Sequence, residues 1–275
     1  MCLTADISDQ EVVVVENSQW VVLGIGAVAL IAGLVLAFLG YRARKKLEAM
    51  AATQTVSASE AARMAEAVPG AKVEVVGTVK ADQPLLSPTG QIPCVYYRYK
   101  LEHRVERRER DSQGNWTTSE NWDTVADRKE QVPFQVCDSS GECLVFPDGA
   151  DFVAETRTHE GYGSPYDSSE ASVIGSVLDG VLDAFDSDYE SVRGYRVTES
   201  VLRVGQPVFV LGSTQRSGEI ASIGKGEGPF IISHKMEEEL TKRYKLHSAL
   251  EFAFGAILAI GGIVGMIYAV AFMAK

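Results

Sequence analysis

Residues that hold metals or carry redox chemistry are scarce in this sequence. It has four Cys and four His in 275 residues. Zinc sites bring several such ligands together at short spacings, and redox motifs often pair two Cys as C-x-x-C. The four histidines are scattered, at His103, His159, His234 and His247. We therefore expect no metal site, although Cys137 and Cys143 flank a predicted hairpin turn and leave a redox pair open.

Basic residues are also in deficit, with 26 Lys and Arg against 37 Asp and Glu and a net charge of −11. Binding to phosphate backbones needs a concentrated basic surface, so we expect no nucleic-acid partner. The glycine-rich segment 224–228 lacks the Lys-Ser or Lys-Thr of a phosphate loop and precedes a strand pattern. We predict no catalytic residue, no cofactor and no cofactor-binding residue.

Charge is absent from two long stretches, one near each end of the chain. Segments 20–41 and 248–275 each contain an apolar run of about 20 residues, long enough to cross the hydrocarbon core as a helix. The preceding tail, 1–19, has acidic residues and no Lys or Arg. A signal peptide would carry a basic start and a shorter apolar run. We therefore predict two retained transmembrane helices and a lipid-bilayer partner.

Basic residues flank both apolar segments on their inner sides. One group follows the first segment, in a helical linker predicted over 42–68, and the other lies before or within a basic segment at 236–247. The positive-inside rule then places the central domain in the cytoplasm and both termini outside, as in a prokaryotic inner membrane.

The central segment, 69–235, has the alternating pattern of β-strands. In 95–105 the odd positions are mostly apolar while Arg98, Lys100, Glu102 and Arg104 share the other face, which is typical of a half-buried antiparallel strand. The segments 70–79 and 205–214 repeat Gly, a V-x-V core and Gly in the same register, by chance or by duplication. We predict a membrane-anchored α+β protein whose domain is mainly antiparallel β, barrel-like or sandwich-like.

Segment 155–193 is rich in Ser, Gly, Asp and Tyr and is predicted to be an acidic insertion in the β domain. Within it, apolar residues recur at helical spacing. This amphipathic helix would either cover an open face of the β domain or contact a partner. The candidate contact residues are Val173, Val177, Leu178, Val181 and Phe185.

Both apolar segments contain small residues four apart, which allow close packing of helices in lipid. The two segments would pack on each other or on further copies, giving a possible homo-oligomer. The candidate packing residues are Ala29, Gly33, Ala37, Gly261, Gly265 and Ala269.

Three stretches carry a resemblance to a known family: VPGAKVEVVGTV continuing to YYRYKLEHRVE, then FQVCDSSGECLVFPDGA, then RVTESVLRVGQPVFVLGS with GPFIIS. Together they resemble the GIDE domain, also called BAM, over about residues 66–235. The domain belongs to mitochondrial membrane-anchored ubiquitin ligases and to many prokaryotic proteins. In the ligases, a zinc-binding RING finger after the second span supplies the E3 activity.

The chain ends at Lys275, directly after the second apolar segment, so we expect no RING finger. We therefore interpret the protein as a membrane-anchored interaction or scaffolding module with an unknown protein partner. One alternative is a RING-less component of an E3 ubiquitin-ligase-like pathway. Another is an oligomeric channel or membrane-remodelling protein that uses the small-residue faces of its helices.

Overall fold

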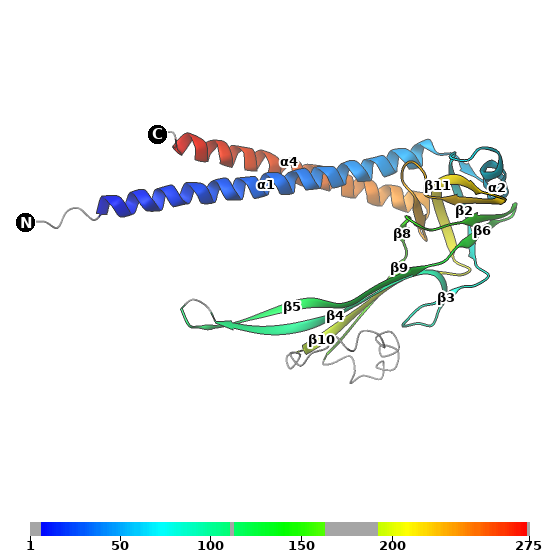
Figure 1. Cartoon of the computed structure of the whole chain (residues 1–275), viewed down its shortest axis with the longest axis horizontal. Helices are drawn as coiled ribbons and strands as arrows, with labels where there is room; N and C mark the ends of the chain where they lie inside the picture. Colours follow the sequence, from blue (N-terminus) through cyan, green and yellow to red (C-terminus); the bar gives the residue numbers. More distant parts are fainter. Residues whose placement is uncertain (1–6, 111–112, 163–191, 274–275) are drawn as a thin grey trace, which may run out of the picture. The chain divides into compact units, whose positions relative to one another are not determined.

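The computed structural model describes residues 7–110, 113–162 and 192–273. The chain divides into two compact units, one formed by the two terminal segments up to Ala52 and from Glu237, the other by Thr53–Met236. Figure 1 shows both units, one helical and the other mostly strands. Because contacts are concentrated within each unit, the two units are described separately.

The helical unit is an antiparallel pair, α1 (Ile7–Ala52) and α4 (Glu237–Met273). Both helices are long and apolar enough to cross a membrane. They approach closely at glycines seven residues apart: Gly26 and Gly33 on α1 face Gly262 and Gly255 on α4, and Gly40 packs against Phe252. A Cβ added at Gly33 would lie 2.7 Å from the carbonyl oxygen of Gly255, so only glycine permits this helix spacing.

The second unit is built around a closed β-barrel. Strand β2 (Lys72–Lys80) pairs with both β6 (Phe134–Asp138) and β11 (Pro207–Ser217), and β7 (Gly141–Val145) and β12 (Ile220–Gly224) complete the ring. The pairs are antiparallel except for β7 with β12. Three short strands extend this sheet: β1 (Thr55–Val56), β8 (Asp151–Val153) and β13 (Ile231–Ser233). The predicted fold class, α+β and mainly antiparallel with a barrel-like domain, is confirmed.

Apolar side chains from the barrel strands fill the core, where Phe134 and Phe230 are almost completely buried. Helix α2 (Ala58–Ala67) contributes its small face, because Ala58 and Ala61 belong to the same buried cluster. This helix fell in the linker predicted over 42–68, but it lies within the unit that starts at Thr53. The remainder of that segment, up to Ala52, continues α1.

The DSSG turn between β6 and β7 caps α2. Asp138 accepts a hydrogen bond from the Ala58 amide at 2.8 Å, and the Ser140 hydroxyl accepts one from the Ser59 amide at 3.0 Å. The Ser57 side chain accepts the Glu60 amide at 3.3 Å. Three amides at the helix start, which have no partner within the helix, are therefore satisfied.

The repeated segments at 70–79 and 205–214 pair with each other as neighbouring strands, β2 and β11. Equivalent residues of the two segments are related by a local twofold axis. Val75 pairs with its equivalent, Val210. On either side, Val73 pairs with Gly212, and the corresponding pair is Gly77 with Val208. Flanking backbone bonds obey the same symmetry, with Gly70 N–H to Thr214 O at 2.7 Å and Gly205 N–H to Val79 O at 2.8 Å.

A second, open sheet extends from the barrel and is dominated by the 18-residue strand β4 (Pro93–Arg110). Its strands run in the order β5 (Trp116–Gln131), β4, β10 (Val192–Arg203) and β9 (Glu155–Tyr162), all antiparallel, and β3 (Leu85–Leu86) pairs with the start of β4. Figure 1 shows these long strands side by side.

The acidic insertion predicted over 155–193 is therefore shorter than expected. Its first eight residues form β9, an edge strand paired with β10 from Gly194↔Tyr162 to Val201↔Glu155. Six of these eight residues are exposed, so the strand has no apolar alternation that would have revealed it. Residues 163–191 lie outside the described part of the chain.

Candidate interaction surface

Strand alternation gives the open sheet two chemically different faces. On β4, Tyr97, Tyr99 and Leu101 point to a buried face, where Tyr195, Val197 and Val201 of β10 join them. The intervening residues of β4 point to the opposite face and are exposed or half-buried. We call this second side the charged face and define it by Arg98, Lys100, Glu102, Asp127, Glu160 and Arg196.

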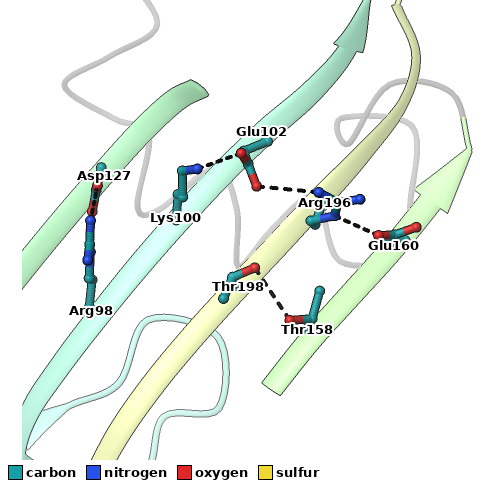
Figure 2. Close-up of polar contacts among 8 residues, drawn as sticks. All are labelled: Arg98, Lys100, Glu102, Asp127, Thr158, Glu160, Arg196 and Thr198. Atoms are coloured by element: carbon teal, nitrogen blue, oxygen red, sulfur yellow. Dashed lines mark hydrogen bonds and ion pairs between the residues drawn. The ribbon is translucent and has the colours of Figure 1, made fainter. Parts of the chain in front are cut away.

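Ion pairs cross the charged face from one edge strand to the other, as Figure 2 shows. Arg98 of β4 makes two hydrogen bonds to Asp127 of β5, at 2.9 and 2.6 Å. Lys100 bonds Glu102 at 2.5 Å on the same strand. Because partners on neighbouring strands lie close together on one face, such pairs hold long side chains in fixed positions.

Arg196 of β10 connects three strands. Its guanidinium bonds Glu160 of β9 at 2.6 Å and lies 3.9 Å from Glu102 of β4. It also stacks over the ring of Trp122 from β5, with the guanidinium carbon 4.0 Å from the ring centroid. A guanidinium stacked on an aromatic ring and fixed by carboxylates presents its remaining donors in a defined direction.

Hydroxyl pairs continue the polar surface between β9 and β10. Thr158 and Thr198 have their hydroxyl oxygens 3.5 Å apart (Figure 2), and Thr156 and Ser200 have theirs 2.8 Å apart. Most of this surface reaches solvent, since the Arg98 and Glu160 side chains are 53% and 55% exposed. The result is a broad, polar sheet face with donors and acceptors available for a partner.

The buried face also carries a histidine and a glutamate. His103 lies almost completely buried on β4, and its burial lowers the pKa of the imidazole. Glu199 of β10 is also buried and accepts a hydrogen bond from the Thr89 amide at 2.9 Å. That bond ties the loop between β3 and β4 to the sheet, which is a structural role.

The two cysteines near the hairpin turn are separated by the strand register. Cys137 of β6 pairs with Glu142, whereas Cys143 of β7 pairs with Val136. Adjacent residues on a strand point to opposite faces, so the two sulfurs project to different sides. Cys143 lies in the barrel core, where burial raises the pKa of its thiol to about 11. Both thiols are free in the structure, which does not support the redox pair.

The structure brings some of the predicted helix-packing residues together and leaves others apart. Gly33 and Ala37 lie against Gly255, and Ala269 is buried. Ala29 is half-buried. By contrast, a Cβ added at Gly261 or Gly265 would meet no atom within 4 Å. The contacts between helices thus centre on the glycines spaced seven apart, and of these only Gly33 is among the predicted packing residues.

The predicted partner-contact residues lie outside the described part of the chain: Val173, Val177, Leu178, Val181 and Phe185. Among the residues that the structure does describe, no group of three or more His, Cys, Asp or Glu side chains could hold a metal ion. The charged face is therefore the candidate site that the described residues support best.

Comparison with known families identifies the chain. The model of the GIDE family, described as E3 ubiquitin ligase, matches residues 102–267. The chain belongs to the GIDE family. No curated protein and no solved structure gives a significant match.

The GIDE match includes the second half of β4, all of β5, β9 and β10, and most of α4. It therefore spans the strands of the charged face, except for the first part of β4 that carries Arg98 and Lys100. Alternation in the sequence had placed the β4 residues of this face together. Trp122, Glu160 and Arg196 were missed, because only the pairing of β4 with β5 and β10, and of β10 with β9, brings them to the same surface.

Proposed function

We propose that this GIDE protein is a membrane-anchored interaction module that binds a protein partner through its charged face. The observation that carries the proposal is the Arg196 cluster, in which residues from three other strands fix the guanidinium on the open sheet. An ordered guanidinium loses less conformational freedom on binding than a free one. Arg and Trp are also enriched among residues that dominate binding energy at interfaces.

Anchoring strengthens this role. A domain held at a bilayer meets membrane-bound partners at a raised effective concentration, so a modest affinity suffices for occupancy. Support for the anchor comes from the two apolar helices of the helical unit. The basic residues next to the apolar runs favour a cytoplasmic domain with both termini outside, as in an inner membrane.

A second candidate function is participation in a ubiquitin-ligase-like pathway. It is supported by the description of the matched family, E3 ubiquitin ligase. In that case, the charged face would bind a conjugating enzyme or its substrate. Testing requires a purified conjugating enzyme and the full chain in detergent: saturable binding that depends on Arg196 supports this candidate, and no binding rejects it.

Charge reversal on the charged face tests the main proposal. We expect proteins that co-purify with the wild-type chain from membranes to be lost with Arg98→Glu combined with Arg196→Glu. The matched control reverses two exposed barrel cations, Lys72→Glu and Lys225→Glu, and should retain the partners. Equal loss in both variants, or equal retention, would contradict a specific role for the charged face.

Sidedness can be tested at the exposed DSSG turn. Ser139→Cys in a background with Cys2→Ser and Cys137→Ser places a single accessible thiol on the barrel and removes the N-terminal thiol, which the proposed topology puts outside. A membrane-impermeant maleimide should label it only after cells are permeabilised. Labelling in intact cells would place the domain outside.

A further inference from the structure

The helical unit has a cluster of basic residues, in 41–52 and 240–251, directly beyond the end of its apolar surface. Gly40, the last residue of the apolar run in α1, packs against Phe252, the first residue of the apolar run in α4, at 2.9 Å from an added Cβ. Both runs therefore end at the same level of the hairpin. For the two-span protein, this level corresponds to the boundary between acyl chains and lipid headgroups.

Cations crowd the turns immediately beyond this level. Residues 41–52 and 240–251 contain seven Lys and Arg side chains and two carboxylates, Glu48 and Glu251. The cations are Arg42, Arg44, Lys45, Lys46, Lys242, Arg243 and Lys245. All are exposed except Lys46, which is half-buried. The excess of positive charge is therefore concentrated at headgroup height, although the protein as a whole is acidic.

The basic residues lie on different faces of the two helices. Lys245 precedes Phe252 by seven residues, or two turns, so the two side chains lie on the same face of α4. Arg44 of α1 reaches this side, because its guanidinium carbon lies 4.3 Å from the centroid of the Phe252 ring. Arg44 and Lys245 thus lie on the Phe252 side of the hairpin, Arg44 against the ring and Lys245 two turns, about 10 Å, farther from the apolar run. Of the two carboxylates, Glu251 lies next to Phe252 on α4 and also packs against Gly40. Glu48 lies on the same face of α1 as Arg44, one helical turn farther from the apolar run.

Three of the other cations, Arg42, Arg243 and Lys46, lie differently, whereas Lys242 shares the face of Lys245 at a spacing of three residues. Arg42 and Arg243 are each two residues from Arg44 and Lys245, a rotation of about 200° around the helix. They therefore point away from the Phe252 side. Lys46 lies 5.4 Å from the ring centroid of Tyr244, which defines a separate contact.

We infer that Arg44, Lys245 and Phe252 form a binding site for the headgroup of an anionic phospholipid. The two cations would contact the phosphodiester, and Phe252 would lie against the upper part of an acyl chain. Basic residues between membrane helices at headgroup height bind anionic lipids through this combination of charge and apolar contact. A free phosphate would have the charge contact alone.

Native mass spectrometry of the full chain in detergent, with added phosphatidylglycerol or phosphatidylcholine, tests the site. We expect about a tenfold preference for phosphatidylglycerol, the order given by one or two basic contacts to a headgroup. Arg44→Gln with Lys245→Gln should reduce the preference to near unity. The charge-retaining pair Arg44→Lys with Lys245→Arg should keep it, and the matched control Arg42→Gln with Arg243→Gln should keep most of it.

Several results would overturn the inference. A wild-type chain without preference excludes a lipid site, and equal losses in the two Gln pairs indicate diffuse attraction rather than a site. Inorganic phosphate at the concentration of the lipid should leave phosphatidylglycerol bound. Displacement by phosphate would assign the cations to free anions. The wild-type preference and the phosphate competition need no substitution, so they decide the question even if a variant fails to fold.

Discussion

The barrel and the open sheet of the second unit are both built from mainly antiparallel strands but differ in what their faces do. The barrel closes on itself through β2 and β11 and buries an apolar core, which includes Phe134 and Phe230. The open sheet leaves one face polar, with ion pairs whose members are often a third or more exposed. Apolar burial contributes far more to stability than exposed ion pairs do. Stability should therefore reside in the barrel and binding in the charged face.

Removing a large core side chain should show this difference most strongly. Phe230 is 1% exposed in the barrel cluster, so Phe230→Ala should lower the free energy of unfolding by about 3–5 kcal/mol. Denaturant unfolding of the full chain in detergent measures the change. Tyr162→Ala in β9 serves as the control, since its ring is 90% exposed and its loss should change stability by under about 0.5 kcal/mol. Similar effects of the two substitutions would contradict the comparison.

Adding a methyl group at the barrel closure should have the next largest effect. A Cβ at Gly77 would lie 2.5 Å from the carbonyl oxygen of Cys137 on the paired strand β6. Since this neighbour is backbone, Gly77→Ala should cost about 1–3 kcal/mol through displacement of the strands. The neighbouring exposed residue gives a control, Thr78→Ala, expected to cost under about 1 kcal/mol in the same unfolding experiment. An unchanged free energy of unfolding in Gly77→Ala would show that the strands can move apart at this point without cost.

The capping turn links barrel stability to pH. Hydrogen bonds from Ser140 and from the Ala58 amide hold the pKa of Asp138 below its ordinary value. A depressed carboxyl pKa means that the stabilisation is present above the ordinary carboxyl pKa and is lost as pH falls through the folded-state value. Asp138→Asn should therefore cost about 1 kcal/mol at neutral pH and progressively less in acid. A cost that stays constant down to the acid limit would exclude the carboxylate as the cause.

The charged face should contribute least to stability. A double-mutant cycle on Arg98 and Asp127, whose side chains are 53% and 36% exposed, should give a coupling energy of at most about 1 kcal/mol. High salt should reduce it further. Urea unfolding of the wild-type chain, Arg98→Ala, Asp127→Ala and the double variant provides the four values. A coupling energy of several kcal/mol would show that the ion pairs of this face stabilise the fold, contrary to the prediction.

Strong periodic patterns made much of the fold predictable. The charge-free runs at either end indicated the helices that became α1 and α4, and alternation in 95–105 separated the two faces of β4. The edge strand β9 was hidden because its exposed side chains follow no apolar pattern. Arg196 and Trp122 lie on β10 and β5, which are both paired with β4. Their contact depends on that pairing, which no residue spacing in the sequence indicates. Register likewise decided that Cys137 and Cys143 point apart.

Site-specific photo-crosslinking from intact membranes tests the central claim most directly. A photoreactive amino acid at Thr198, on the same side of the sheet as the charged face, should form a defined crosslink to a partner protein. The same group at Glu227, an exposed position on the loop between β12 and β13, should not form it. A crosslink of equal yield from Glu227, or no crosslink from Thr198 in membranes that contain the partner, would contradict docking through the charged face.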